Sequence, residues 1–392
     1  MLATLRAQVE GCALATAAFA RLYDDVRPDA LVVLNGRFFA HRAALELARL
    51  CGIRVHAHER GGLKDTLTWR SGNAYQDLEP TRALWAARAH LPLAAEELEL
   101  VRRTLAERRV GRGMSWSVQY SPAPQEEAAL RERLALDARP IVAVFTSSDD
   151  EQATFPDYRA GAFPQSLDWL PATVELARRM PDHVFVIRMH PGLVSFGAND
   201  QALRRAEELA AALPENCRLV RPKDDVSSYT LADIAAVGIV YYTTLGMEMA
   251  ARGQQVVCVA KGWYSHGGFC RFAATAEAYE SAVRAASIAA RAGPDREVAR
   301  RAHRFLFHYF GDQSLAFPLV REEPMHTGKP TWRRTSDLLP GKDAVLDRLC
   351  EAVLEDREVF PHARPDDAAR TSAVEDAYLA GFASLQAPYT RS

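Results

Sequence analysis

The sequence predicts a two-domain α/β protein built on parallel β-sheets. Short, continuous apolar runs alternate with helical segments, which is typical of buried parallel strands joined by crossover helices. Polar residues directly follow several of these runs, at the positions where open parallel sheets bind ligands. The length of 392 residues suits two domains of ordinary size better than one.

The first part of the chain contains a strand–helix–strand unit. An Ala- and Leu-rich helix ends before Pro28, and the next apolar run leads through the turn Asn35-Gly36-Arg37 into a second helix, which Gly52 ends. The polar segment 61–80 is predicted to be a loop. The expected helices cover residues 2–26, 40–50, 81–89 and 94–109, and the expected strands cover residues 30–34 and 53–58.

A segment mixing Gly, Ser and Pro at 111–124 precedes a second series of elements. Here strands and helices alternate regularly, which predicts a doubly wound parallel sheet. The expected strands are 141–145, 184–187, 217–220, 238–242 and 255–259, and the expected helices are 167–180, 201–213, 227–236, 246–252, 276–309 and 344–354.

These elements divide the chain into three parts. We expect an N-terminal Rossmann-like domain over residues 1–135, a C-terminal, ligand-binding Rossmann-like domain over 136–290, and helices and a tail over 291–392 that pack back on the N-terminal domain. The N-terminal domain shows two strands before its helices, whereas such a domain usually has more. It is therefore short, and an incomplete domain is one interpretation.

Composition and charge exclude several classes of function. The 48 basic and 50 acidic residues give a net charge of −2, which provides no electrostatic footprint for nucleic acid. The six cysteines lack the close spacing of a zinc or redox pair, so we expect a reducing, cytoplasmic compartment. We also expect no signal peptide and no membrane-spanning segment, because the apolar runs are short or interrupted by polar residues.

Three predicted strands of the second domain end in polar groups suited to an anionic ligand. Backbone N–H groups at a helix start and hydroxyl donors favour phosphate, a cation can neutralise it, and a glycine allows close approach. Simpler interpretations are that a threonine caps a helix, that Arg188 is a surface cation and that His190-Pro191 forms a turn. The candidates are Ser147, Ser148 and Glu151, then Arg188 and His190, then Thr243, Thr244, Gly246 and Glu248.

The order and spacing of these motifs over about residues 30–310 resemble bacterial capsular-polysaccharide and surface-glycan glycosyltransferases, including Kdo-transferase-like capsule proteins. The resemblance implies a GT-B fold, in which two Rossmann-like domains face a cleft and the C-terminal one holds a nucleotide-sugar donor. It implies no metal and no cofactor, and a glycan or small-molecule acceptor. The motifs are Asn35–Phe38, Glu59–Gly61, Ser147–Glu151, Arg188–Pro191, Ser228–Leu231, Thr243–Glu248 and Tyr264.

The resemblance also suggests roles for individual residues. His190 would contact the donor phosphate together with Thr243, which stands where relatives usually have serine, and Thr244. Glu248 would hold ribose or sugar hydroxyls. The His-Pro pair with two hydroxyls is similar to that of CMP-sugar users, so a CMP-sugar is weakly preferred. Further substrate-binding candidates are Ser228 and Tyr229, and also Tyr264, whose ring could stack on the base or sugar.

A catalytic base is expected from the N-terminal domain, because an inverting transferase needs a group that takes the proton of the acceptor hydroxyl. Glu59 directly follows a predicted strand and is the candidate. Asn35 and Arg37 follow the neighbouring strand and are candidates for substrate contacts. Glu59 could equally be a structural partner of Arg37 or Arg60.

Other functions remain open on the sequence alone. Teichoic-acid-type glycerophosphotransferases carry a similar Arg-x-His-Pro segment, but Tyr242-Thr243-Thr244 lacks the Asp of their Asp-Tyr-Ser-Ser stretch. Sugar-nucleotide 2-epimerases share the fold, yet their usual paired acidic motif is not seen. The short first domain also fits a non-catalytic binding module in a glycan-assembly system, to which the chain could attach peripherally at a membrane.

Overall fold

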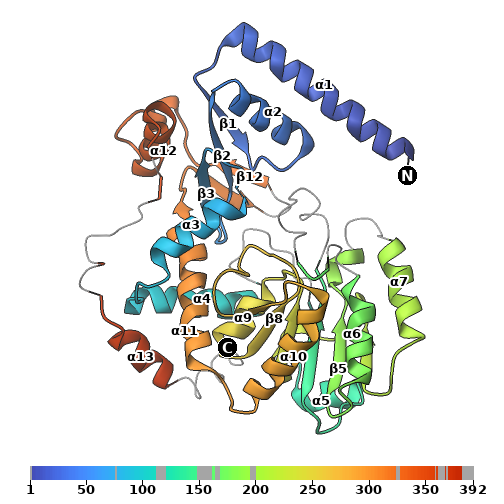
Figure 1. Cartoon of the computed structure of the whole chain (residues 1–392). Helices are drawn as coiled ribbons and strands as arrows, with labels where there is room; N and C mark the ends of the chain where they lie inside the picture. The colour runs from blue at the N-terminus through green and yellow to red at the C-terminus, as the bar shows by residue number, and fades with distance from the viewer. Residues whose placement is uncertain are drawn as a thin grey trace. The chain divides into compact units, whose positions relative to one another are not determined.

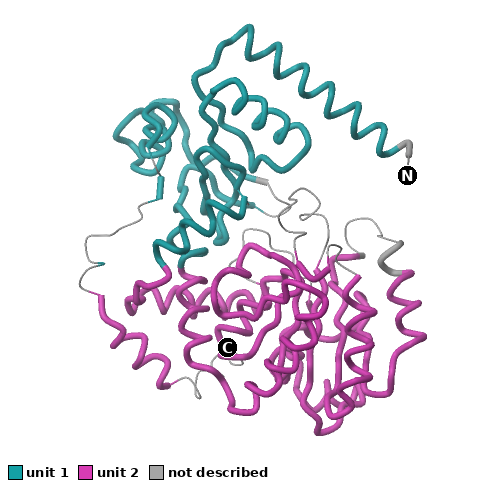
Figure 2. Tube along the Cα trace, viewed as in Figure 1, with its two compact units in different colours: residues 1–88, 113–117, 308–368 teal, residues 89–112, 118–307, 369–392 magenta. Residues whose placement is uncertain are grey.

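The computed structural model describes residues 2–75, 77–111, 121–147, 161–163, 168–194, 200–323, 327–357, 359–360, 367 and 370–381. The chain forms two compact units, which Figure 1 shows as a ribbon and Figure 2 in separate colours. Unit 1 comprises residues 1–88, 113–117 and 308–368. Unit 2 comprises residues 89–112, 118–307 and 369–392.

Unit 2 contains a six-stranded sheet in the order β6-β5-β4-β7-β8-β9, and every neighbouring pair is parallel. Counted from β4, this is the order 3-2-1-4-5-6 of a Rossmann sheet. The predicted doubly wound α/β fold is therefore confirmed, and its strand order reverses between β4 and β7. The strands are β4 (Ile141–Phe145), β5 (Val184–Arg188), β6 (Cys217–Val220), β7 (Val237–Val240), β8 (Gln255–Cys258) and β9 (Arg271–Phe272).

The four central strands of the unit 2 sheet, β5, β4, β7 and β8, are buried at every residue, and helices cover the sheet (Figure 1). The predicted helix over 276–309 is two helices, since Gly293 adopts a φ of +85° and Pro294 follows it. The described helices between residues 127 and 307 are α5 (Glu127–Arg133), α6 (Trp169–Arg178), α7 (Asp200–Ala210), α8 (Ser228–Ile234), α9 (Leu245–Ala251), α10 (Ala276–Ala290) and α11 (Arg296–Phe307), with a 3₁₀ turn at Pro191–Val194.

Unit 1 contains a four-stranded mixed sheet in the order β1-β2-β3-β10. Strand β1 (Ala30–Leu34) pairs in parallel with β2 (Arg54–Arg60) around helix α2 (Phe39–Leu50), which confirms the predicted strand–helix–strand unit. The sheet then continues with antiparallel strands β3 (Thr66–Ser71) and β10 (Leu315–Ala316). The first domain is thus short, as predicted. Its sheet, expected to be parallel, is mixed, because only the β1–β2 pair is parallel.

The prediction of a loop over residues 61–80 is wrong, because β3 lies within it. Polar Thr66, Thr68 and Arg70 alternate with Leu67 and Trp69, so the segment reads as polar although one face is apolar. Trp69 packs on a cluster with Leu349, Ala352, Val359 and Phe360. The remaining elements of unit 1 are α1 (Leu2–Val26), α3 (Leu78–Arg88), a π-helix (His308–Asp312), β11 (Val320–Glu323), β12 (Thr327–Pro330), a 3₁₀ turn (Thr335–Leu338) and α12 (Ala344–Glu355).

The division into units differs from the predicted domain boundaries in two places. Helices α4 (Ala95–Arg109) and α5, both expected in the N-terminal domain, belong to unit 2. Residues 308–368 belong to unit 1, where β10 pairs with β3, whereas α11 and α13 (Ala373–Ala380) belong to unit 2. Within the described part of the chain, no helix has both the length and the apolar character needed to cross a membrane.

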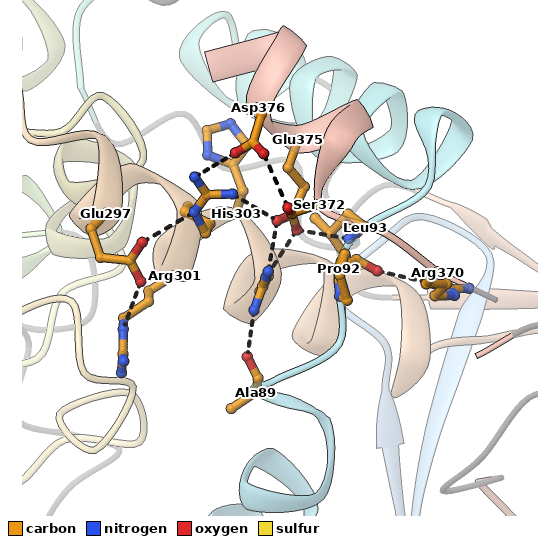
Figure 3. Close-up of polar contacts among 12 residues, drawn as sticks. Ala89, Pro92, Leu93, Glu297, Arg301, His303, Arg370, Ser372, Glu375 and Asp376 are labelled. Atoms are coloured by element: carbon orange, nitrogen blue, oxygen red, sulfur yellow. Dashed lines mark hydrogen bonds and ion pairs between the residues drawn. The ribbon is translucent and has the colours of Figure 1, made fainter. Parts of the chain in front are cut away.

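Helix α13 is anchored to unit 2 by one buried carboxylate. Glu375 accepts hydrogen bonds from the Leu93 backbone N–H at 2.7 Å, from Arg304 Nη2 at 2.7 Å and from Arg300 Nη1 at 3.2 Å (Figure 3). These partners come from α11 and from the segment before α4. The neighbouring Asp376 bonds Arg300 Nη2 at 2.8 Å but lies at the surface. Glu375 is therefore the point at which three separate segments of unit 2 meet.

We predict that Glu375→Ala lowers the free energy of unfolding by about 3–5 kcal/mol, because it leaves the partly buried Arg304 without its carboxylate. The control is Asp376→Ala, which should change it by less than about 1 kcal/mol, since a solvent-exposed ion pair contributes little. The Glu375 side chain is 2% exposed and the Asp376 side chain is 53% exposed. Chemical denaturation measures both, and equal losses would contradict the central role of Glu375.

Candidate functional site

The carboxyl ends of four strands in unit 2 meet at one edge of the sheet. The register aligns Phe145 of β4 with Arg188 of β5 and with Val240 of β7, and Val240 with Cys258 of β8. Residues that follow these strands therefore emerge side by side. This confirms that the polar groups predicted at successive strand ends share one edge, which is where open parallel sheets bind ligands.

Two hydroxyls after β4 fix the neighbouring strand ends. Thr146 Oγ1 accepts a hydrogen bond from the backbone N–H of His190, after β5, at 2.7 Å. Ser147 Oγ accepts from the backbone N–H of Tyr242, after β7, at 3.3 Å. Strands β5 and β7 lie on opposite sides of β4, so the two adjacent hydroxyls brace the point where the strand order reverses. Ser147 itself is buried; the predicted Ser148 and Glu151 lie outside the described residues.

The His190 ring is held in one orientation by its own loop. Its Nδ1 accepts a hydrogen bond from the Gly192 backbone N–H at 3.1 Å. Because the accepting nitrogen carries no proton, the neutral ring has its proton on Nε2. His190 is half-buried at the sheet edge. In this tautomer the Nε2–H is a donor that can bond a phosphate oxygen.

Thr243 and Thr244 lie between β7 and α9. The Thr244 hydroxyl makes no capping bond to α9, so the simpler interpretation of Thr244 as a helix-capping side chain is wrong. The backbone of Thr243 is held in place, because its carbonyl oxygen accepts a hydrogen bond from the Tyr264 hydroxyl at 2.6 Å. Both threonines are half-buried at the same edge as His190.

Tyr264 and Gly246 support this edge from inside the domain. Tyr264 is 1% exposed and stacks on Phe269 with a ring-centroid distance of 6.0 Å. Burial raises the pKa of Tyr264, so its hydroxyl stays a donor to Thr243. A Cβ on Gly246 would lie 2.5 Å from the Tyr264 hydroxyl. The expected stacking of Tyr264 on a ligand therefore does not match its place, and Gly246 makes room for this tyrosine.

Arg188 is a buried brace between two loops. Its guanidinium donates to the Arg221 carbonyl oxygen and, at 3.4 Å, to Ser228 Oγ. The side chain is 1% exposed. Burial lowers the pKa of Arg188 to about 10, so it stays charged at neutral pH. The structure brings the predicted Arg188 and the half-buried Ser228 together, and the alternative of Arg188 as a surface cation is wrong.

Glu248 pairs with an arginine that the sequence reasoning missed. Its Oε1 lies 2.9 Å from Arg108 Nη2 and 3.0 Å from Arg108 Nε, and both residues are buried. Arg108 Nη2 also donates to Thr244 Oγ1 at 2.7 Å. The predicted Tyr229 is part of the same group: its hydroxyl bonds Glu248, and burial raises the pKa of Tyr229.

The sequence signal that could have indicated Arg108 is the pair of arginines at the end of α4. Cations in the last turn of a helix are stabilised by the negative end of the helix dipole. The second, Arg109, bonds Asp233 of α8 at 3.0 Å. A pocket beside this group is lined by Leu105, Arg109, Glu248 and Arg252. Its volume of about 10 Å³ suits one water molecule rather than a ligand.

The three candidates of the first domain lie together in unit 1. Asn35 Nδ2 donates to Glu59 Oε2 at 2.7 Å, and Arg37 Nη2 lies 3.9 Å from the same oxygen. The Arg60 backbone N–H donates to Glu59 Oε1 at 3.0 Å. Glu59 thus has the structural partners that the sequence suggested. Asn35 takes a positive φ of 38° in the tight turn that brings its side chain to β2.

No protein-family model and no curated protein matches the sequence. Similar solved structures include KpsC of Thermosulfurimonas dismutans, a beta Kdo 2,4 transferase. Its identity is 15% and its TM-score 0.44, and the match covers 70% of this chain and 78% of that one. Another is the Neisseria meningitidis UDP-GlcNAc 2-epimerase bound to UDP-GlcNAc, with 11% identity, 76% and 80% coverage, and a TM-score of 0.32.

The C-terminal CMP-Kdo binding domain of WaaA from Acinetobacter baumannii is also similar, with 13% identity and a TM-score of 0.27; 46% of this chain covers 95% of that domain. KpsC and the WaaA domain are both named for Kdo, as are the Kdo-transferase-like proteins that the sequence motifs resemble. Because all three TM-scores are below 0.5, the fold is defined here by the strand order of unit 2 itself.

We predict that Gly246→Ala lowers the free energy of unfolding by about 1–3 kcal/mol, because the added methyl group overlaps the Tyr264 hydroxyl. Adding Tyr264→Phe should recover part of this loss, since it removes the overlapping oxygen. Thermal or chemical denaturation of both single variants and the double variant checks this. Additive losses in the double variant would contradict the packing role of Gly246.

Proposed function

We propose that the protein is a glycosyltransferase that binds a nucleotide-sugar donor at the carboxyl edge of the unit 2 sheet. One observation carries the proposal: His190 and the pair Thr243–Thr244 flank the strand-order reversal of a Rossmann sheet, and Thr146 and Ser147 fix the strand ends that present them. Ligands of open parallel sheets bind at this reversal. A CMP-sugar is the donor we favour, on the resemblance of the His-Pro and hydroxyl pairs to those of CMP-sugar users.

The chemistry of glycosyl transfer fits these groups. Breaking the bond between the sugar and the phosphate places negative charge on the leaving nucleotide. Fixed donors aimed at that phosphate stabilise the transition state, because they need not reorganise as the charge develops. The His190 Nε2–H and the hydroxyls of Thr243 and Thr244 are such donors. We propose no metal, since these groups and the half-buried Lys261 after β8 supply the stabilisation.

Glu59 is the proposed general base, which would take the proton of the acceptor hydroxyl. Asn35 Nδ2 and the Arg60 backbone N–H hold one oxygen each of its carboxylate, so its orientation is set. Asn35 and Arg37 would contact a glycan or small-molecule acceptor. The proposed setting is cytoplasmic synthesis of a surface polysaccharide or glycoconjugate, with peripheral association with a membrane-bound glycan-assembly system.

The binding part of the proposal is tested with a thermal-shift panel of CMP, CDP, UDP and GDP. A nucleotide present at 100 times its Kd should stabilise the chain by about 2.7 kcal/mol and raise its melting temperature. His190→Ala should remove the shift, and His90→Ala, at an exposed position, should keep it. Absence of a shift with all four nucleotides would contradict the proposed donor site.

The catalytic part is tested with Glu59→Gln, which keeps the shape of the side chain but cannot accept a proton at neutral pH. We expect the rate of CMP release from a CMP-sugar in the presence of acceptor to fall about 10²–10⁴-fold. Nucleotide binding, measured by the same thermal shift, should stay as in the wild type. An unchanged rate would leave Glu59 as a partner of Asn35 and Arg37 alone.

A further inference from the structure

Arg108, at the end of α4, spans the first turn of α9. Its Nη2 lies 2.7 Å from Thr244 Oγ1 and 2.9 Å from Glu248 Oε1, and its Nε donates to the same Glu248 oxygen at 3.0 Å. Thr244 and Glu248 are four residues apart on α9, so a single guanidinium holds both. Arg108 and Glu248 are 8% and 4% exposed. Moving either away would leave a buried charge without its partner.

This contact makes the Thr244 hydroxyl oxygen a hydrogen-bond acceptor. A guanidinium has donors and no acceptor, so Thr244 Oγ1 accepts from Arg108 and its own proton takes no part in that bond. The hydroxyl also makes no capping bond to α9. The proton of Thr244 therefore remains for a further acceptor, and the residue is half-buried at the edge where the donor phosphate is proposed.

Arg108 also prevents an internal competitor from taking that proton. Glu248 lies one turn along α9 from Thr244, within the spacing at which helix side chains meet. Its carboxylate is a strong acceptor, but its Oε1 is engaged by Arg108 twice. Without the guanidinium, the Thr244 O–H could turn to Glu248, and the carboxylate, without its cation, would repel a phosphate.

We propose that Arg108 is a positioning residue of the donor site, which holds Thr244 Oγ1 as an acceptor and so presents the Thr244 O–H to a phosphate oxygen of the ligand. This inference rests on the proposed function and adds to the donor site a residue of helix α4. Arg108 acts through Thr244, so its effect on binding depends on the hydroxyl at position 244.

Arg109 provides a matched control. It is the next residue of α4, it is also buried, and it also makes an ion pair, with Asp233 of α8 at 3.0 Å. Its guanidinium lies 5.2 Å from the centre of the Tyr229 ring. Arg109→Gln should therefore disturb the packing of α4 about as much as Arg108→Gln does, without affecting the Thr244 hydroxyl.

The test is calorimetric titration of the full chain with CMP, with UDP, GDP and CDP in parallel, and a melting temperature for every variant. Thr244→Val and Arg108→Gln should each weaken nucleotide binding about tenfold, the size of one lost hydrogen bond to a charged group. The double variant should bind no more weakly than Thr244→Val alone, since the two changes remove the same bond. Arg109→Gln should keep wild-type affinity even where its melting temperature falls, and Arg108→Lys should restore part of the affinity.

Wild-type affinity in Arg108→Gln, or a double variant weakened by the product of the two single effects, would overturn the positioning role. A loss of affinity in Arg109→Gln equal to that in Arg108→Gln would overturn it too, because the effect would then come from packing. If the wild-type chain binds none of the four nucleotides, the proposed function fails and this inference fails with it. Wild-type binding with an unaffected Arg108→Gln removes the positioning role alone.

Discussion

The buried ion pair of Arg108 and Glu248 joins helix α4 to the edge of the parallel sheet at which the polar groups lie. Burying two charges has a large desolvation cost, which is offset when both partners are bonded, as they are here. The other end of α4 is held in a similar way, because Glu97 bonds Arg370, which precedes α13. Helix α4 is thus fixed at both ends by buried charge pairs within unit 2, and the groups of α8 and α9 are fixed with it.

Much of the polar chemistry at the sheet edge supports the structure rather than facing a ligand. Thr146, Ser147 and Arg188 brace strand ends and loops, and Tyr264 holds Thr243 through its carbonyl. Buried polar groups need partners, and here they find them in the backbone of neighbouring loops. His190 and the two threonines are among the half-buried side chains that this framework presents, and the proposed donor site rests on them.

In unit 1, polar side chains are also held together at the end of a pair of parallel strands. The parallel pair β1–β2 sets Asn35 beside Glu59, since the register that pairs Leu34 with His58 continues by one residue. A carboxylate that accepts from an amide side chain and a backbone N–H is held in one orientation, which suits both a structural partner and a base. A substitution of Glu59 separates these roles, because loss of a base lowers turnover, whereas loss of a structural partner affects folding.

The sequence by itself determined the doubly wound sheet of unit 2, because continuous apolar strands and alternating helices leave few other ways to bury so much surface. It also placed Asn35 with Glu59 and His190 with Thr243 and Thr244, since parallel strands end at a common edge. Only the tertiary structure decided which of these polar side chains are covered. Arg188 ends a strand and Tyr264 comes after one, as His190 does, but the side chains of Arg188 and Tyr264 are buried. It also brought Arg108 to Glu248 across 140 positions of sequence, a pairing that no local pattern encodes.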